Sequence, residues 1–573
     1  MELELPTVTI PQAILVATEH RQAGRFAEAE KIGRDVLAVE PENAEAWHLL
    51  GVIAHQLGES GIAVDLMEKA LRIQPSVPAF LNDLAEAYSA LNRFDDAERC
   101  FRRALALKPD FAIAHNGLGN ALADLGRLDE AERSYLDALA LDPGCALAHY
   151  NLGIALQALG RLEEAERSYR QASKLKPDYC EAHNNLGNLL KDSGRFDEAE
   201  RSYRAALALR PGFADAHNNL GVVLQMLGRR EEAERSYRQA LALAPADPRI
   251  GMNCSILALL GGDYERGLQH YESRFLGANA KTVAGFRQML ARLDGIQWWR
   301  GEDITGRSLL IWTEQGFGDS IMMLRYLPQL KQRGPGRVAV CCEPELVRVI
   351  RALPGVDGVI SKEQALAPGG FDRHCPAMSL PLRFGTRLDT IPRTVPYLDV
   401  PAESSRSWAD RLARIDRPRV GLVWAGGAIL ADDQRRSIGL DQFARVLQVP
   451  GASFMSLQKG AARAQLRQLG QGIVDRMDEC EDFLDTAALM TNLDLVISVD
   501  TAVAHLAGAL GKPVWLLNRF ESEWRWLLDR EDSPWYPTMR IYRQARRGDW
   551  DEVMERVASA LATWANASAS TAA

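Results

Sequence analysis

Apolar and polar positions follow two different patterns along the chain, and the change between them divides it into two parts. In the first part the pattern repeats at a constant step, equal to the distance from Pro41 to Pro75. Small residues recur at fixed positions, separated by charged runs such as 195–201 that suit the solvent face of a helix. Because proline ends a helix and starts a turn, a proline at the same step predicts a stack of helical hairpins, an α-solenoid. These prolines are Pro41, Pro75, Pro109, Pro143, Pro177, Pro211 and Pro245.

Beyond residue 300 the pattern changes to short apolar runs that alternate with helical stretches. Such an alternation predicts parallel sheets built from βαβ units. We expect two Rossmann-like halves, which would bind ligands at the carboxyl ends of their strands. The expected strands are Ser308–Trp312, Arg337–Cys341, Val420–Trp424, Ser453–Leu457, Leu493–Val499 and Pro513–Leu517. The expected helices include Ser320–Arg333, Glu343–Leu353, Leu440–Leu447 and Thr501–Leu510.

The two patterns also predict several domains in this chain of 573 residues. A hairpin that departs from the repeat is expected to cap the apolar end of the solenoid, and a polar, proline-flanked segment is expected to join the two Rossmann-like halves as a hinge. The expected segments are the solenoid, 10–247; the capping hairpin and linker helix, 248–299; the N-terminal half, 300–400; the hinge, 401–417; the C-terminal half, 418–566; and a disordered tail, 567–573.

The positions seven and eight residues after the prolines, on one helix face of the solenoid, are rich in asparagine. Asparagine is a mediocre helix former, so its repeated use needs a reason. Its amide both donates and accepts hydrogen bonds, which suits binding to the backbone of an extended peptide. Alternatively, the asparagines bridge adjacent repeats or face water. The candidate peptide-binding residues are Asn116, Asn151, Asn184, Asn185, Asn218 and Asn219.

The first candidate for chemistry is the turn Gly316-Phe317-Gly318, which lies between an expected strand and a helix. Its two glycines would let the chain turn sharply and bring backbone N–H groups close to a ligand. Asp319 follows near the helix start, where a carboxylate could be a general base, a helix cap or a partner of the helix dipole. The turn lacks the lysine of a P-loop and the third glycine of a dinucleotide fingerprint, so neither an ATPase nor a dehydrogenase is indicated.

The second candidate runs from Asp500 to His505, directly after an expected strand. The helix that opens at Thr501 and Ala502 offers free N–H groups and its dipole to a diphosphate. His505 lies one turn into that helix, where its ring could donate to an anionic leaving group or be a buried core residue. Its position beside Asp500 at the carboxyl end of a strand favours the functional role.

Polar side chains after two further strands could neutralise phosphate charge. Arg435, Arg436 and Ser437 follow the strand that ends at Trp424, and Lys459 follows the next strand. Arginine and lysine at strand ends bind phosphates, although solvation at the surface explains Lys459 equally well.

Composition narrows the classes of function. The net charge of −9 gives no basic field for nucleic acid. The N-terminal residues lack the regions of a signal peptide, and no apolar run approaches the ~20 residues of a membrane span. The eight cysteines form no CxxC pair, which is typical of reduced thiols. Together with the lack of a signal peptide and of a membrane span, these thiols predict a cytoplasmic protein. The pair Asp549 and Asp551 lies where a helix cap is expected, so we expect no metal.

The constant step between the prolines is that of tetratricopeptide repeats (TPR). The asparagines resemble the ladder in the TPR superhelix of eukaryotic O-GlcNAc transferase. Residues 300–565 resemble the glycosyltransferase domain found behind TPR arrays in many bacterial proteins, which is similar to the heptosyltransferase-like glycosyltransferases of family 9. The stretches that carry this resemblance are Glu314–Asp319, Arg325-Tyr326, Val423–Gly426, Arg435–Ser437, Ser456–Gly460, Asp500–Pro513, Trp524–Trp526 and Ser533–Pro537.

The resemblance implies a GT-B fold and an inverting, metal-independent transfer of a sugar from a nucleotide donor, with no cofactor. Asp319 falls on the proposed base of the family, and a basic residue after the central strand falls on either Arg435 or Arg436. The motif that holds the donor falls on Asp500, Thr501, Ala502 and His505. The other expected donor-site residues are Gly316, Gly318, Ser437 and Lys459.

The N-terminal half is short for an enzyme that glycosylates a lipid core. We therefore expect the TPR groove to deliver a protein acceptor, and the resemblance makes flagellins or surface adhesins the candidates. Two alternatives remain at this point: a protein-interaction scaffold with an inactive or nucleotide-sensing transferase domain, and a glycosyltransferase that acts on lipopolysaccharide. The sequence leaves the donor sugar, the nucleotide and the oligomeric state open.

Overall fold

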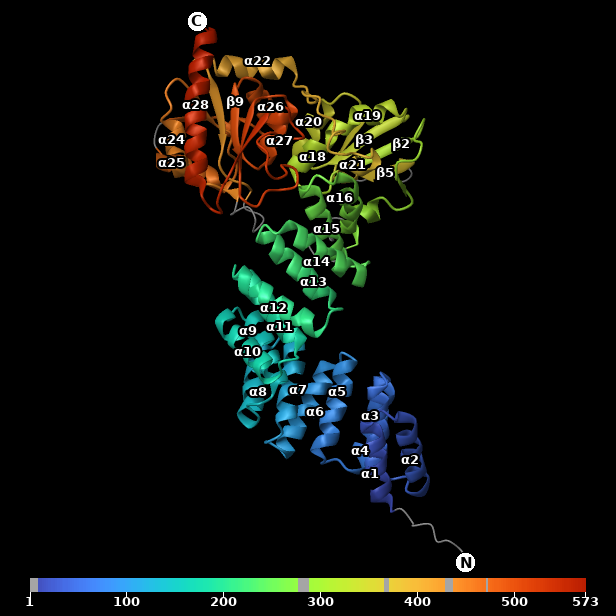
Figure 1. The fold of residues 1–573 in the computed structure, drawn as a ribbon. Coiled ribbons are helices and arrows are strands. Elements are labelled where there is room, and N and C mark those ends of the chain that lie inside the picture. Colours follow the sequence, from blue (N-terminus) through green and yellow to red (C-terminus); the bar gives the residue numbers. More distant parts are fainter. Residues whose placement is uncertain (1–8, 277–287, 365–369, 428–435, 470–471, 573) are drawn as a thin grey trace, which may run out of the picture. The chain divides into compact units, whose positions relative to one another are not determined.

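The computed structural model describes residues 9–276, 288–364, 370–427, 436–469 and 472–572 (Figure 1). The chain divides into two compact units, Met1–Gly228 and Arg229–Ala573. The first is entirely helical where it is described, and the second contains two parallel sheets. An α-solenoid followed by an α/β region is therefore confirmed.

The first unit is a row of antiparallel helix pairs, which Figure 1 shows side by side. Each helix of a pair contacts its partner, and successive pairs contact each other. The helices are α1 Ile10–Gln22, α2 Phe26–Val39, α3 Ala44–Gln56, α4 Ser60–Ile73, α5 Pro78–Ala90, α6 Phe94–Leu107, α7 Ala112–Asp124, α8 Leu128–Leu141, α9 Ala146–Ala158, α10 Leu162–Leu175, α11 Cys180–Asp192, α12 Phe196–Leu209 and α13 Ala214–Met226.

The prolines lie in the short turns between pairs, as the spacing predicts. Pro211, for example, lies between the end of α12 and the start of α13. The His217 ring, in the first turn of α13, donates from Nε2 to the Pro211 carbonyl at 3.0 Å. The same contact recurs in three preceding repeats, and Trp47 makes its equivalent with Pro41 at 2.8 Å. The turn is thus closed by a side chain whose periodicity the sequence reading did not use.

The repeated glycine makes room for an aromatic ring rather than for a close backbone contact. A Cβ atom on Gly187 would lie 2.6 Å from Cε1 of Tyr203 on the paired helix. Tyr203 is fully buried, and its hydroxyl donates to Asn188 Oδ1 at 2.8 Å. Burial raises the pKa of this tyrosine well above its ordinary value, so the hydroxyl stays protonated.

Arginines between successive helix pairs connect neighbouring repeats. Arg195 donates to Glu198 in its own pair at 2.7 Å and to Glu166 of the preceding pair at 2.7 Å. Arg161 makes the same double contact one repeat earlier, with Glu164 and Glu132. The charged runs therefore fix the spacing of the repeats as well as covering their solvent face.

The second unit begins with three helices and a short 3-10 turn: α14 Arg230–Leu243, α15 Pro248–Leu260, α16 Tyr264–Tyr271 and η1 Glu272–Phe275. The compact unit starts at Arg229, one helix earlier than the expected boundary at 248. Tyr264 and Tyr271 are buried against Trp524, with ring centroids 6.2 and 6.1 Å apart. The hairpin expected only to cap the solenoid is thus packed into the α/β region, because its aromatic side chains find their partners there.

All strands of the α/β region pair in parallel where the structure describes them. The first sheet has the order β1-β5-β2-β3-β4 and the second has β11-β10-β9-β6-β7-β8. The strands of the first sheet are β1 Gln297–Trp298, β2 Ser308–Trp312, β3 Arg337–Cys342, β4 Gly358–Ser361 and β5 Arg373–Pro376. The strands of the second are β6 Arg419–Val423, β7 Ser453–Ser456, β8 Ile473–Asp475, β9 Leu495–Val499, β10 Val514–Asn518 and β11 Met539–Arg543.

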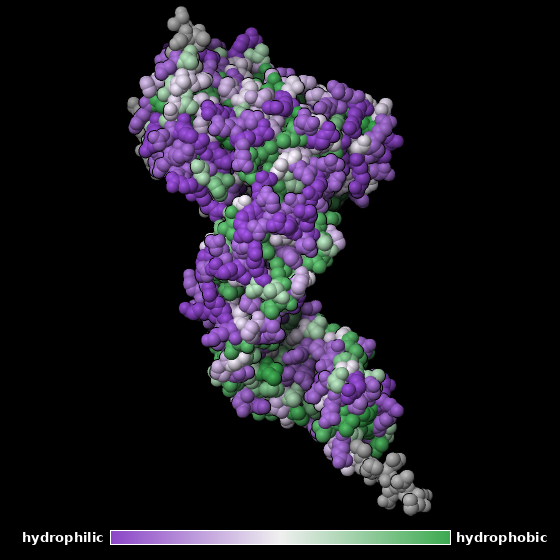
Figure 2. Space-filling model, in the orientation of Figure 1, coloured by the Kyte–Doolittle hydropathy of each residue, from purple (hydrophilic) through white to green (hydrophobic). Residues whose placement is uncertain are grey.

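Helices connect these strands and cover the sheets, and a longer helix follows the last strand (Figure 1). They are α18 Phe317–Met323, η2 Leu324–Tyr326, α19 Leu327–Gln332, η3 Pro344–Leu346, α20 Val347–Arg351, η4 Ala377–Ser379, α21 Leu380–Arg383, α22 Ala402–Arg411, η5 Leu440–Phe443, α24 Ala444–Leu447, η6 Ala461–Gln465, α25 Leu466–Leu469, η7 Met477–Glu479, α26 Phe483–Thr491, α27 Ala502–Ala509 and α28 Trp550–Ala572. Residues of β9 and the helices around it form the apolar core, and the visible surface of the α/β region is mostly hydrophilic (Figure 2).

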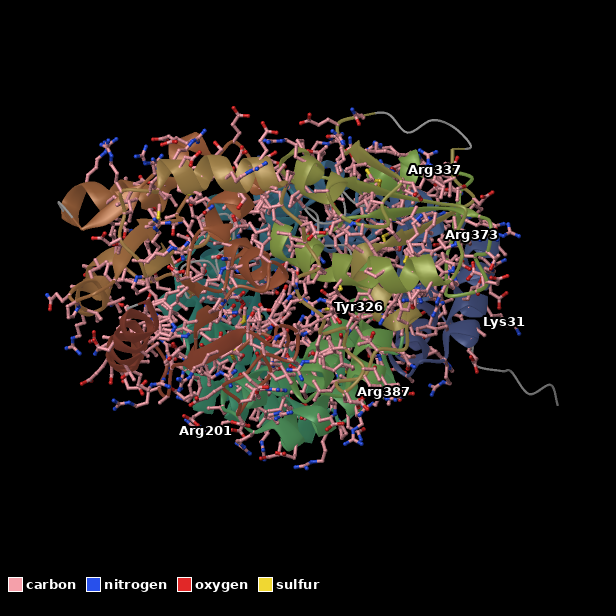
Figure 3. The ribbon with its side chains drawn as sticks, turned by 90° about the horizontal axis from the view of Figure 1, so that it is seen from above. Lys31, Arg201, Tyr326, Arg337, Arg373 and Arg387 are labelled. Carbon is pink, nitrogen blue, oxygen red and sulfur yellow. The ribbon has the colours of Figure 1, made fainter. Side chains whose placement is uncertain are left out.

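In the first Rossmann-like half, a large aromatic side chain is buried, whereas charged side chains lie at the starts of two strands. Tyr326 is fully buried, and its hydroxyl lies 2.8 Å from the Thr386 hydroxyl. Arg337 and Arg373, at the starts of β3 and β5, lie nearer the periphery in the view of Figure 3. The starts of β3 and β5 therefore carry polar side chains, whereas Tyr326 lies in the buried interior of this half.

Two expected segments differ in the structure. The expected hinge, 401–417, contains helix α22, whose Trp408 is buried and which packs against α26. The expected disordered tail is helical up to Ala572 as the end of α28. Its alanine-rich composition explains this, because alanine has the highest helix propensity. Asp549 caps the same helix by accepting from the Glu552 amide at 3.3 Å.

Candidate functional site

The expected base and the expected donor motif meet where the two Rossmann-like halves contact each other. Helix α18, after β2, packs against α27, after β9. A Cβ on Gly318 would lie 2.6 Å from Cδ2 of His505 and 3.3 Å from the Ala502 Cα. Gly318 is therefore required for this close approach. Gly316 has φ −63°, a conformation that any residue can adopt, so its backbone does not require glycine at this position.

Asp319 lies in the first turn of α18, as expected, and its carboxylate is paired with a buried arginine. The Arg525 guanidinium donates to Asp319 Oδ1, and its other nitrogen donates to Glu523 at 2.7 Å. The side chains of Arg525 and Asp319 are 11% and 18% exposed. Burial alone would lower the pKa of Arg525, but the charges of Asp319 and Glu523 hold it above its ordinary value. Arg525 is thus a fixed positive charge at the site.

His505 is a buried, neutral imidazole. Its Nδ1 lies 3.0 Å from the Tyr536 hydroxyl, and its Nε2 lies 4.0 Å from Asp500 Oδ1. The Trp526 ring stacks on it with centroids 5.1 Å apart. Burial lowers the pKa of His505 to about 3; the charge of Asp319 acts against this shift, and the charges of nearby arginines add to it. At neutral pH this ring can donate only as the N–H of a neutral imidazole.

This burial predicts a pH dependence of stability. His505 binds a proton near pH 6.5 in the unfolded chain but only near pH 3 in the folded one. The free energy of unfolding of the second unit should therefore fall as the pH drops from 6.5 toward 3, by about 1.4 kcal/mol per pH unit for this group. Buried His374, with a pKa lowered to about 4, adds to the same loss.

Urea unfolding at pH 6.5, 5.5 and 4.5 checks this, with His505→Gln as the variant. The free energy of unfolding of the variant should fall less steeply with decreasing pH than that of the wild type. The difference should reach at most about 1.4 kcal/mol per pH unit, the contribution of one proton. The matched variant His270→Gln, whose ring is only half-buried, should keep a slope closer to that of the wild type. Equal slopes for His505→Gln and the wild type would contradict the assignment.

The rest of the donor motif lies at the carboxyl end of β9. Asp500 is buried, and Thr501 precedes the first residue of α27 in an extended conformation. The Thr501 hydroxyl lies 3.1 Å from that of Ser498. Ala502 begins the helix, so its amide belongs to the helix N-terminus, where anions are favoured.

The expected phosphate-binding residues lie in different surroundings. Arg436 lies close enough for its charge to lower the pKa of His505. The Ser437 hydroxyl accepts from the Gly426 amide at 3.1 Å, which ties this segment to the end of β6. The Lys459 ammonium donates to the Cys480 carbonyl at 2.5 Å, so it is engaged in holding a loop. Arg435 lies outside the described residues.

The loop before Asp319 is held by side chains from α16 and η1. Arg274 donates to Glu314 at 2.9 Å, and the two side chains are 7% and 6% exposed. Arg274 also donates to Ser379 at 2.8 Å. The Tyr271 hydroxyl and the Gln315 amide exchange hydrogen bonds of 3.0 and 2.8 Å. Helix α16 and η1 therefore position the segment that leads to Asp319.

The asparagine face of the first unit consists of two kinds of residue. Asn116, Asn184 and Asn218 are buried, whereas Asn151, Asn185 and Asn219 are half-buried. The half-buried residues donate to the preceding repeat: Asn151 to Asn116 at 3.1 Å, Asn185 to the Tyr150 hydroxyl at 3.0 Å and Asn219 to Asn184 at 3.3 Å. Bridging between repeats, the alternative weighed from the sequence, is thus present. Peptide binding stays a prediction that rests on the half-buried residues.

Sequence reasoning missed several residues of the site. Arg525, Trp526 and Tyr536 lie in stretches that carry the family resemblance but have no predicted role, yet they contact Asp319 or His505. Trp526 is fully buried, and its Nε1 has no hydrogen-bond partner among the described residues. Tryptophan flanking an arginine in a segment without helical or strand periodicity was the signal that could have pointed to them.

Two features are absent from the residues that the structure describes. They contain no group of three or more His, Cys, Asp or Glu side chains placed to hold a metal ion. Across the same ranges, no helix combines the length and the hydropathy that crossing a membrane requires.

Comparison with known proteins finds matches for both the N-terminal repeats and the C-terminal region. Residues 17–78, 82–144 and 184–248 match one tetratricopeptide repeat family, and residues 146–212 match another. Residues 481–527 match glycosyltransferase family 9 (heptosyltransferase). Protein FlbA of Caulobacter vibrioides is 30% identical over 334 residues, which cover 54% of this chain and 54% of that protein. The chain thus spans about half the length of the curated relative that it matches.

Solved TPR structures resemble part of the chain. TTC0263, a TPR protein of Thermus thermophilus, shows 28% identity, a TM-score of 0.29, and coverage of 32% of this chain and 100% of its own. YrrB, described as a TPR protein with an unusual peptide-binding site, shows 26% identity, a TM-score of 0.29, and coverage of 33% and 96%. The chain is therefore a protein with tetratricopeptide repeats across its N-terminal part and a C-terminal α/β region that is similar to glycosyltransferase family 9.

Proposed function

We propose that the protein is an inverting glycosyltransferase that moves a sugar from a nucleotide donor to a hydroxyl of a protein acceptor. The observation that carries this is the packing of α18 on α27, which brings Asp319 and His505 together across the two halves. A carboxylate and an anion-binding helix start at one place are the groups that glycosyl transfer needs.

The residues would divide the chemistry as follows. Asp319 accepts the proton of the acceptor hydroxyl while that oxygen attacks the anomeric carbon of the sugar. The bond to the leaving diphosphate breaks on the opposite face, so the anomeric configuration inverts. The start of α27 and the arginines near it neutralise the leaving nucleoside diphosphate, without a metal or a cofactor. His505, held neutral, donates its N–H to that anion.

The acceptor in this proposal is a protein held by the TPR array. The half-buried amides of Asn151, Asn185 and Asn219 each have two donor hydrogens and an oxygen that accepts up to two bonds. Asn151 donates to Asn116 and Asn120, and Asn185 donates to Tyr150 and accepts from Asn184, which leaves acceptor capacity on the oxygens for a peptide N–H. Amides in a row bind peptide backbone with little dependence on sequence. Flagellins and surface adhesins are the first acceptors to test, and a cytoplasmic location belongs to the same proposal.

A transfer assay with the full chain tests this function. The chain is incubated with UDP-, GDP-, dTDP-, ADP- and CMP-linked sugars and with candidate acceptor proteins, and the intact mass of the acceptor is measured. We expect a mass gain of one sugar from one donor class. Sugar that appears only in a lipid fraction would move the acceptor to lipopolysaccharide, and no transfer from any donor would favour a scaffold.

The same assay tests the asparagine face. Replacing Asn151, Asn185 and Asn219 by alanine should raise KM for the acceptor protein by about tenfold or more, because three hydrogen bonds are lost. The value of kcat should stay unchanged, since the lost binding is common to substrate and transition state. Gln74→Ala, which removes an exposed amide at a hairpin turn, is the matched control. An unchanged KM with a folded triple variant would refute peptide binding by this face.

A further inference from the structure

Arg525 lies in the loop after β10, residues 519–530, and is the ion-pair partner of the proposed base. The residue is 9% exposed. Besides Asp319 and Glu523, its guanidinium lies over the Trp524 ring, 4.6 Å from the centroid. The Trp524 ring in turn contacts Tyr271 of α16. The guanidinium is therefore placed by a packed aromatic surface and not only by its charge partners.

The loop that carries Arg525 has an unusual and well-fixed backbone. Leu527 and Asp529 both adopt a φ of 52°, in the left-handed region that residues with a Cβ rarely occupy. Arg543 of β11 holds this conformation by donating to the carbonyls of Trp526 and Leu527 at 3.2 and 2.8 Å. Strain of this kind persists only where the surroundings impose it, and it gathers at functional sites.

The ion pair conflicts with the role of Asp319. The Arg525 guanidinium donates to Asp319 Oδ1, so this oxygen is already engaged by a hydrogen bond. That oxygen is not free to accept the acceptor proton while Arg525 holds it. A guanidinium also matches phosphate oxygens, with two parallel N–H donors, as well as it matches a carboxylate. An arriving phosphate would compete with Asp319 for the same donors.

We propose that Arg525 binds the diphosphate of the nucleotide sugar and releases Asp319 when it does so. This inference rests on the proposed function. In the unliganded protein the Asp319 carboxylate occupies the guanidinium. When the donor binds, a phosphate oxygen replaces the carboxylate, and Asp319 becomes free to take the acceptor proton. The new bond joins the acceptor oxygen to the anomeric carbon, the bond from that carbon to the diphosphate oxygen breaks, and the electron pair leaves on the diphosphate beside Arg525.

Calorimetric titration of the full chain with inorganic pyrophosphate, and then with UDP, GDP, dTDP and ADP, tests the exchange. Arg525→Gln should weaken pyrophosphate binding by about tenfold or more, because a charged hydrogen bond is lost. Arg525→Lys should lie between this variant and the wild type. Asp319→Asn should bind pyrophosphate more tightly, by about threefold or more, because the competing charge is gone. Arg530→Gln, in the same loop but paired with Asp532, should bind as the wild type does.

A purely structural ion pair predicts a different result, in which both Asp319→Asn and Arg525→Gln weaken binding. That result would overturn the exchange, as would pyrophosphate binding that is unchanged in Arg525→Gln or absent from the wild type. Melting of each variant without ligand separates these outcomes from misfolding. If sugar transfer requires Asp319 but the titrations fail, the proposed function stands without the exchange. If the titrations succeed and no donor is used, the anion site stands without the transferase.

Discussion

Asp319→Asn is expected to lower the rate of sugar transfer by about 10²- to 10⁴-fold, the usual contribution of a general base. The amide has the same shape as the carboxylate and can still accept a hydrogen bond from Arg525, but it cannot take the acceptor proton. The loss should appear in kcat, because the variant keeps the groups that bind the donor. Steady-state transfer to the acceptor protein, measured by intact mass, provides the rates.

Asp389→Asn is the matched control. Its carboxylate is exposed and pairs only loosely with Arg387 at 3.5 Å, so its replacement should leave kcat within experimental error. Turnover by Asp319→Asn at the rate of the wild type would show that another group accepts the proton. A loss confined to KM would instead show that Asp319 serves binding.

Arg274→Leu should lower the free energy of unfolding of the second unit by about 3–5 kcal/mol. The substitution leaves Glu314 buried without the charge that compensates it, and it removes the bond to Ser379. Burial already raises the pKa of Glu314, so this carboxyl depends on its arginine to stay ionised. Urea unfolding followed by tryptophan fluorescence reports this unit, because Trp47 is the one tryptophan of twelve that precedes residue 229.

Arg266→Leu supplies the comparison, since Arg266 pairs with Glu234 at 3.0 Å in an exposed setting. An exposed pair contributes at most about 1 kcal/mol, so this variant should unfold nearly as the wild type does. Replacing both Arg274 and Glu314 by apolar residues should recover part of the loss, because no buried charge is then left alone. A cost for Arg274→Leu no larger than that for Arg266→Leu would contradict the proposed role of the buried pair.

Much of the fold could be predicted because its signals are local. The prolines and small residues specify each hairpin within a single repeat, and the apolar runs of β2, β3, β6, β9 and β10 stand out against polar flanks. The strands β1, β4, β5, β8 and β11 were not predicted, because they are short and carry polar residues. Helix α22 was missed because its burial depends on Trp408 meeting α26, a contact that composition does not reveal.

The sequence predicted two separate parts of the candidate site but not the contacts between them. Asp319 and the run from Asp500 to His505 each follow a strand, and so each could be placed at a carboxyl edge. The partner of Asp319 could not be found in this way, because Arg525 is 206 residues away and lies in a loop without periodicity. The neutral state of His505 likewise follows from burial by Trp526 and Tyr536, which come from a later part of the chain.

The grouping of α14, α15 and α16 with the α/β region has a consequence for how such proteins diversify and how they can be engineered. Repeats before residue 229 can be added, lost or exchanged between relatives without touching Tyr271 or Arg274. The last proline of the repeat series is Pro245. A chimera joined there would separate α14 from α15 and α16, with which it forms one compact unit. Exchanges of the repeats should therefore be cut at the Gly228–Arg229 junction, and we expect the length of the array to be free to vary while the last hairpin stays with the α/β region.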